Sequence, residues 1–222
     1  MDFLEDICLT EEIHGLWLAR KTIYEMIDDR KYVTNEPRKT EEEFRKLYMI
    51  SNTVFSTSIP AVQRHATSPK QPNLIVCFPS EEKLRIQSIR DIIEYGETHA
   101  SKFYHIIIVY RKSITPSAKS QLAQIKSEKK HMRIETFGVD ELQYNPSKHV
   151  WVPPHRILSK AEKKTVLESL KCSQEHLPRI LICDPIVRYY GGRANQVMEI
   201  LKPTPDGNWC KHWRLISNRI MQ

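Results

Sequence analysis

The stretch of this sequence best suited to bind a ligand is a short basic segment that ends in a helix start. Its residues are Arg111, Lys112, Thr115, Pro116, Ser117 and Lys119. Thr115 can cap the first amides of a helix, and the proline after it fits the first helical position. A helix start presents unpaired amides and the positive end of a dipole, so it attracts phosphate. From the residues alone, a phosphate contact and a merely well-capped helix both stay open.

A second stretch, residues 177–201, combines a short helix with crowded arginines. Its three arginines, Arg179, Arg188 and Arg193, lie within fifteen residues. Asp184 and Pro185 indicate a helix start, and the pair Gly191-Gly192 offers the left-handed geometry that ends a helix. Guanidinium groups crowded in this way are suited to carboxylate or phosphate surfaces, although a solvated rim is the plainer interpretation.

The catalytic alternatives have weaker support. The six glycines form neither a dinucleotide fingerprint nor a phosphate loop. The residues Cys172, His176, Cys183, Cys210 and His212 match no zinc-ligand spacing, so neither a metal nor a cofactor is expected. Two E-x-K fragments, Glu81-Glu82-Lys83 and Glu128-Lys129-Lys130, would suit a nuclease, but the strands before the first fragment lack a second carboxylate for Mg²⁺. We therefore expect no catalytic residues, and keep a free-standing nucleic-acid-binding or nuclease-like protein as the alternative.

The sequence predicts alternating helices and strands along the first two thirds of the chain. The residues before position 16 show little periodicity and are expected to form a peripheral extension. Helices are predicted from Leu16 to Ile27, after the capping box of Thr40 and Glu43, from a cap at Ser80 to Gly96, and from Thr115 through Ile125. Strands are predicted at Ile59–His65, Asn73–Phe78, Tyr104–Tyr110 and Met132–Phe137. This alternation is typical of an α/β domain.

The last third of the chain is predicted to be a second, smaller α/β domain. Asn145-Pro146 and a change in composition place the boundary there, so the predicted domains are residues 1–146 and 147–222. Ser159 and Glu162 form a capping box that opens a helix. Residues 196–201 and 209–216 are predicted to form a hairpin that reverses at Asp206-Gly207. The fold class is therefore α/β (α+β), with two domains.

The charge of the chain is unevenly distributed. The whole chain carries a formal net charge of +7, and residues 148–222, with 13 basic and 6 acidic side chains, account for that excess. Within the balanced remainder, residues 64–133 also hold 13 basic and 6 acidic side chains. Two basic regions of this kind predict anionic partners, either nucleic acid or acidic protein.

The cysteines and the hydropathy indicate the compartment in which the protein works. The five cysteines are odd in number and include no C-x-x-C pair, so we expect reduced and mostly buried thiols in place of a disulfide framework. The sequence has no apolar run of 18 residues and no signal pattern, so no membrane partner is expected and the chain is expected to be soluble and intracellular.

Four motifs taken in order resemble one known family. These motifs are LWLARKTIYEMIDDRKY at residues 16–32, TPSAK at 115–119, HVWVPPHRILSKA at 149–161, and the series LPRI, DP, RYYG and NQV within 177–197. They are similar to the shared fifth subunit of eukaryotic nuclear DNA-directed RNA polymerases and to its archaeal counterpart. The resemblance covers nearly the whole chain from Leu16 onward.

The resemblance implies a non-catalytic subunit of a multisubunit RNA polymerase. Its C-terminal domain would assemble with the largest subunit, one of several subunit partners. The candidate interface residues that the resemblance implies are Pro178, Arg179, Asp184, Pro185, Arg188, Tyr189, Gly191 and Gln196. Its N-terminal, jaw-type domain would lie near downstream double-stranded DNA, with the segment around TPSAK closest to it and without sequence specificity. The resemblance also implies a nuclear location.

The sequence departs from the family pattern in three places. Before Gln196, residues 192–195 replace the lysine-arginine-glycine sequence that is usual in the family. The loop PTPDGN stands where the family has a loop of the serine-glutamate-threonine type. Residues 218–222 extend beyond the end of the family pattern. The polymerase class and host therefore stay open among a divergent protist enzyme, a class-specific paralogue and a viral polymerase, for which a cytoplasmic viral factory or a virion is the alternative location.

Overall fold

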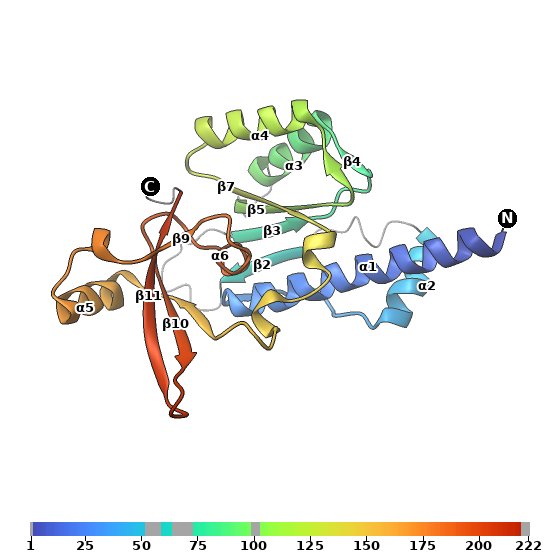
Figure 1. Ribbon diagram of the computed structural model, residues 1–222. Helices are drawn as coiled ribbons and strands as arrows, with labels where there is room; N and C mark the ends of the chain where they lie inside the picture. Colours follow the sequence, from blue (N-terminus) through green and yellow to red (C-terminus); the bar gives the residue numbers. More distant parts are fainter. Residues whose placement is uncertain (1, 52–58, 64–72, 99–102, 219–222) are drawn as a thin grey trace. The chain divides into compact units, whose positions relative to one another are not determined.

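The computed structural model describes residues 2–51, 59–63, 73–98 and 103–218 (Figure 1). The chain forms two compact units, Met1–Tyr144 and Asn145–Gln222, called unit 1 and unit 2 below. None of the helices in these described ranges combines the length and the apolar character that crossing a membrane requires.

Unit 1 is built on a mixed five-stranded sheet. Its strands, in spatial order, are β1 (Tyr32–Val33), β2 (Ile59–Gln63), β3 (Asn73–Cys77), β5 (Phe103–Tyr110) and β7 (Arg133–Gly138). The first three strands pair antiparallel, and β3, β5 and β7 run parallel. The strands predicted from the sequence are confirmed to within a few residues, except that residues 64 and 65 lie outside the described ranges.

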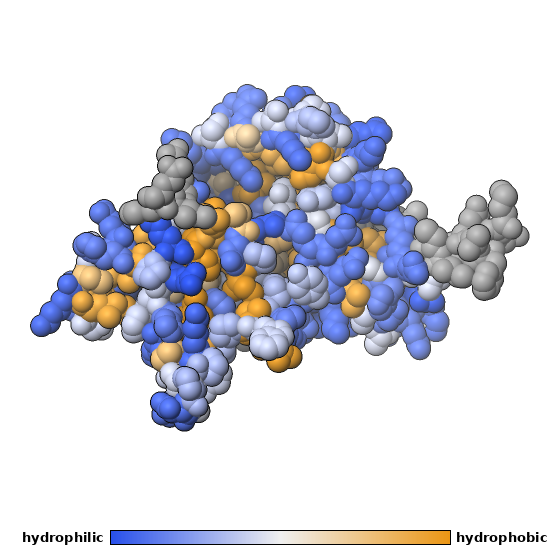
Figure 2. Space-filling model, in the orientation of Figure 1, coloured by the Kyte–Doolittle hydropathy of each residue, from blue (hydrophilic) through white to orange (hydrophobic). Residues whose placement is uncertain are grey.

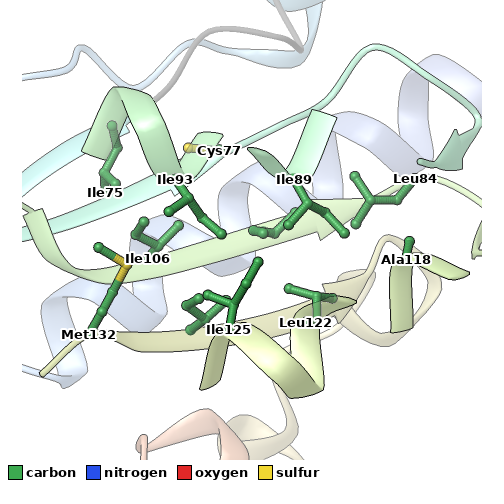
Figure 3. Close-up of a cluster of buried hydrophobic side chains, with 12 residues drawn as sticks. Ile75, Cys77, Leu84, Ile89, Ile93, Ile106, Ala118, Leu122, Ile125 and Met132 are labelled. Atoms are coloured by element: carbon green, nitrogen blue, oxygen red, sulfur yellow. The ribbon is translucent and has the colours of Figure 1, made fainter. Parts of the chain in front are cut away.

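Helices cover both faces of this sheet. The crossover helices α3 (Ile86–Thr98) and α4 (Pro116–Glu128) lie on one face, and α1 (Asp2–Asp29) lies on the other, beside α2 (Glu41–Ser51) (Figure 1). Successive side chains of a strand point to opposite faces. Ile106 of β5 accordingly joins the cluster under α3 and α4 (Figure 3), and Ile108 belongs to the same cluster. The predicted capping box of Thr40 and Glu43 is confirmed at the start of α2.

Three local predictions in unit 1 are wrong. Residues 2–15 belong to α1, because the buried Ile13 extends the apolar stripe of the helix one turn upstream of Leu16. Ser80 caps no helix, since the chain first forms β4 (Lys83–Leu84), which pairs in parallel with β6 (Ser113–Ile114). Gly96 does not end α3, which buries this glycine and continues to Thr98.

A cluster of charged side chains is buried on the α1 side of the sheet. The Glu135 carboxylate accepts hydrogen bonds from Arg30 Nη2 at 2.9 Å and from His105 Nε2 at 3.0 Å, and also pairs with Arg133. Burial alone would raise the pKa of Glu135, but the charges of Arg30 and Arg133 and the His105 hydrogen bond outweigh it and hold that pKa well below its usual range. Burial lowers the pKa of His105 despite the carboxylate, so the neutral ring donates to Glu135 and accepts from the Tyr32 hydroxyl.

Unit 2 is built on a four-stranded sheet in the order β8 (His155–Ile157), β10 (Val197–Pro203), β11 (Trp209–Ser217) and β9 (Arg179–Leu181). The predicted hairpin of β10 and β11 is confirmed, with Gly207 at a φ of +78° in its turn. One face packs against α5 (Lys160–Leu170) through Val197 and Leu215, and the other against α6 (Pro185–Tyr189) through Met198 and Ile216. The capping box of Ser159 and Glu162 is confirmed at the start of α5.

The single-turn helix α6 depends on the residues at its two ends. The Asp184 side chain accepts from the amides of Ile186 and Val187, as predicted. Gly191 adopts a φ of +67°, whereas Gly192 is needed for a different reason. A Cβ on Gly192 would lie 2.6 Å from Val187 Cγ1 and 2.7 Å from Ile216 Cδ1, so this glycine admits close packing of the helix end against β11.

Acid should destabilise unit 1 through the Glu135 cluster. Both His105 and Glu135 have a lowered pKa in the folded chain, so their contribution is full above the unfolded values of about 6.5 and about 4.3 and is lost as the pH falls below each. Urea unfolding of the full chain at pH 7.5 and 5.5 should show a smaller pH effect for His105→Gln than for wild type. The exposed His149 provides a control in His149→Gln, and an equal pH effect in all three proteins would contradict this role of His105.

Replacing Gly191 by valine should destabilise unit 2. A β-branched side chain at positive φ costs on the order of 1 to 3 kcal/mol, whereas asparagine tolerates that conformation much better. We therefore expect a lower melting temperature for Gly191→Val than for Gly191→Asn, measured by circular dichroism on the full chain. A valine variant that melts with the wild type would show that the left-handed geometry does not limit stability.

Candidate nucleic-acid and assembly sites

The start of α4 in unit 1 leaves one backbone amide available to a ligand. Thr115 Oγ1 accepts from the Ala118 amide, and the Thr115 carbonyl accepts from the Lys119 amide. Pro116 has no amide hydrogen, and no hydrogen bond of the described residues uses the Ser117 amide. The exposed Lys119 side chain adds a positive charge within the same helical turn. The predicted cap is thus confirmed, and the arrangement can bind a phosphate oxygen.

The short parallel pair of β4 and β6 fixes this helix start. The Thr115 amide donates to the Leu84 carbonyl at 3.2 Å, and the Lys112 amide donates to the Glu82 carbonyl at 3.0 Å. Both segments follow the carboxyl ends of parallel strands, β3 and β5. The helix start is therefore held by the sheet of unit 1, although no sequence pattern indicated this two-stranded pair.

Arg111 has an internal role that the sequence did not indicate. Its guanidinium pairs with Glu12 of α1 and donates to the Ser80 carbonyl at 3.1 Å, and its side chain is only 13% exposed. This arginine therefore connects α1 to the segment that follows β3. A phosphate at the start of α4 would have to compete with Glu12 for it.

Lys112 is more accessible than Arg111. Its ammonium lies 3.0 Å from Glu82, and both side chains are mostly exposed, at 63% and 59%. The hydrogen bond and the charge of Lys112 lower the pKa of Glu82, and the same contact raises the pKa of Lys112. An exposed pair of this kind is weak, so Lys112 can turn to an anion.

The candidate interface residues of unit 2 fall into a structural and an accessible group. Tyr189 is buried, and its hydroxyl accepts from Asn145 Nδ2 at 2.9 Å. Gln196 Oε1 accepts from the Arg193 amide at 2.7 Å, so this glutamine shapes the loop before β10. The accessible group consists of Pro178 and Pro185, which are exposed, and Arg179 and Arg188, which are half-buried. Asp184 and Gly191 act on the backbone of α6, as described above.

Sequence reasoning missed an exposed apolar pair at the beginning of unit 2. Val150 and Trp151 are 95% and 87% exposed, although they are large apolar side chains. The signal was present in HVWVPP, where three large apolar residues stand close together. In the structure Val150 and Trp151 lie in a turn that the Val152 amide closes by donating to the His149 carbonyl at 2.9 Å. Two adjacent apolar side chains with this exposure make the segment a candidate contact surface.

The residues considered for catalysis do not assemble into a site. Glu82 pairs with Lys112, Lys129 with Glu97, and Glu128 accepts from Gln124. Within the described ranges, no three His, Cys, Asp or Glu side chains are placed to hold a metal ion. The expectation of mostly buried thiols is wrong for unit 2, because Cys183 is exposed and Cys172 and Cys210 are half-buried, whereas Cys77 of unit 1 is buried. Cys8 lies in a part of α1 whose side chains are not described.

Comparison with known proteins places both units in one family. Residues 10–95 match the model for RNA polymerase Rpb5, N-terminal domain, and residues 144–216 match that for RNA polymerase Rpb5, C-terminal domain.

Full-length relatives agree with these matches. The chain is 30% identical over 210 residues to the DNA-directed RNA polymerases I, II, and III subunit RPABC1 of Caenorhabditis briggsae, covering 92% of this chain and 97% of the relative. It is 31% identical to the Dictyostelium discoideum subunit rpabc1 of the same polymerases, with 87% and 93% covered. It is 32% identical to the DNA-directed RNA polymerases IV and V subunit 5B of Arabidopsis thaliana, with 85% and 84% covered. With both domain models matched and such relatives aligned along most of its length, the chain belongs to the Rpb5 family of DNA-directed RNA polymerase subunits.

Proposed function

We propose that this Rpb5 subunit is non-catalytic, that it binds the largest polymerase subunit through unit 2, and that it holds the start of α4 near the backbone of downstream double-stranded DNA. Polymerases I, II and III, to which its relatives belong, transcribe nuclear DNA, so the proposed location is the nucleus. The observation that carries the DNA contact is the capped start of α4, with its available Ser117 amide and Lys119.

The contact to DNA should be independent of sequence. One amide and two lysines can reach phosphate oxygens, and phosphate contacts position a protein without reading bases. The start of α4 is fixed by the β4–β6 pair, so little ordering is needed when it meets a duplex. Arg111 contributes indirectly, because it holds the neighbouring segment through Glu12 and Ser80.

Support for anchoring through unit 2 comes from its surface. Burying the exposed apolar side chains of Val150 and Trp151 against a partner would be favourable. The half-buried Arg179 and Arg188 can donate hydrogen bonds to carboxylates of the partner. The residues that cap α6 hold Arg188 on this short helix, whereas Arg179 lies at the start of the edge strand β9. Removing the Trp151 side chain should therefore weaken assembly while leaving the fold of unit 2 intact, since that side chain is almost fully exposed.

Replacing Lys112 and Lys119 by glutamine should reduce the salt dependence of DNA binding. Each lost phosphate contact removes about one unit from the slope of log affinity against log salt, so the pair removes about two. The measurement is duplex DNA binding by reconstituted polymerase between about 50 and 200 mM salt.

The matched control for this pair is Lys46→Gln with Lys130→Gln, which removes the same charge from exposed positions elsewhere in unit 1. Arg111 is left unchanged, because its loss would disturb the contact with Glu12. Polymerase containing either pair should assemble normally. Equal slopes for the wild-type, test and control enzymes would leave the start of α4 as a helix cap only.

A fragment of residues 145–222 should bind the largest subunit, and a fragment of residues 1–144 should not. The longer assembly fragment is preferable to 147–222, because Asn145 donates to the Tyr189 hydroxyl and accepts from the Ser147 amide. We expect 147–222 to melt at a lower temperature than 145–222 and to bind more weakly in a pull-down with the purified largest subunit. Binding by 1–144 alone would reverse the roles proposed for the two units.

A further inference from the structure

Unit 2 contains an open, basic groove that belongs to neither surface proposed above. It runs along α5 and the turn that follows, η3 (Gln174–His176), and has a volume of about 790 Å³. The basic side chains that line it are Lys160, Lys163, Lys164, Lys171 and His176. Of the residues that line it, only Glu168 is acidic, so the groove is strongly positive.

Lys163 gives this groove a charge that the fold holds in place without neutralising it. The half-buried ammonium donates to Gln174 Oε1 at 2.6 Å and to the Asn195 carbonyl at 2.8 Å. Both acceptors are neutral, and an ammonium has three donors. One N–H of Lys163 therefore stays available to an anion, at a position fixed by two hydrogen bonds.

The floor of the groove is apolar. Leu167 and Cys172 line it and also pack against the buried cluster of Leu158, Leu177, Val197 and Leu215. Figure 2 shows apolar surface over α5 with hydrophilic side chains at its edges. A ligand that fits would thus bring an aliphatic group to the floor and negative charge to the lysines.

The span of the lysines sets the size of such a ligand. Lys160 and Lys171 are eleven positions apart, which corresponds to roughly 17 Å along a helix. An extended peptide covers that distance with about five residues. The lining residues include no Phe, Tyr or Trp, and the His176 imidazole is the one ring among them, so the groove offers little surface for stacking nucleic-acid bases.

We propose that this groove binds a short acidic segment of another protein, with carboxylates on the lysines and one or two aliphatic side chains against Leu167 and Cys172. Charge and the apolar floor act together here. An oligonucleotide would satisfy the lysines but would leave the floor uncovered, so the apolar surface favours a peptide.

The probe that tests this proposal is a fluorescent twelve-residue peptide of alternating glutamate and leucine, added to the full-length chain at about 100 mM salt. The groove variant combines Lys160→Gln, Lys164→Gln and Lys171→Gly. Lys171 has a φ of +49°, so glycine removes its charge and also relieves its backbone. The control variant combines Lys46→Gln, Lys83→Gln and Lys130→Gln, which removes the same charge from exposed sites in unit 1.

The groove variant should bind the peptide about tenfold more weakly than the wild type, and the control variant within about twofold. A peptide with serine in place of leucine should also bind weakly. Bound peptide should slow the alkylation of Cys172 by iodoacetamide, measured by mass spectrometry, and should leave the exposed Cys183 unaffected.

Three outcomes would overturn the proposal. The first is equal affinity of the groove variant and the wild type for the leucine peptide. The second is equal affinity of the wild type for the serine and leucine peptides, which would reduce the groove to a charged surface. The third is displacement of the peptide by a 20-bp duplex whose own binding is lost in the groove variant alone, which would assign the groove to nucleic acid.

Discussion

The frame of unit 1 depends on one buried carboxylate. Glu135 of β7 receives Arg30 from the end of α1, His105 from β5 and Arg133 from its own strand, and the Tyr32 hydroxyl of β1 reaches the far nitrogen of His105. A buried charge is costly unless it is paired, so removing any one of these partners would leave another charge of the cluster uncompensated. The cluster consequently specifies how α1 sits on the sheet.

The position of α1 then determines what the candidate DNA site can do. Because α1 is held on the sheet, its Glu12 meets Arg111 at the end of β5 and occupies a guanidinium that would otherwise attract phosphate. The accessible charge is left to Lys112 and Lys119 at the start of α4. Arg111 therefore connects elements of unit 1, whereas its sequence neighbours Lys112 and Lys119 can face a ligand.

Sequence patterns were informative wherever the deciding interaction is local. The caps at Thr40, Thr115, Ser159 and Asp184 involve residues two or three positions apart. Strands β3 and β5 of unit 1 are likewise marked by apolar runs. The failures arise from distant partners. Ser80 has the residue type of a cap, but the segment after it is taken by β6, and the contacts of Arg111 and Glu135 join positions about a hundred residues apart, which no periodicity reveals.

The separation between Arg30 and Glu135 has a consequence during synthesis of the chain. The two residues are 105 positions apart, so a ribosome that adds about 5 to 20 residues per second completes α1 roughly 5 to 20 seconds before its counter-charge exists. Throughout that interval the chain carries the apolar stripe of α1, and Arg30, which follows the helix, lacks its Glu135 partner. The ion pair that joins the end of this helix to β7 can therefore form only after β7 emerges, so the Glu135 cluster is among the last contacts of unit 1 to be completed.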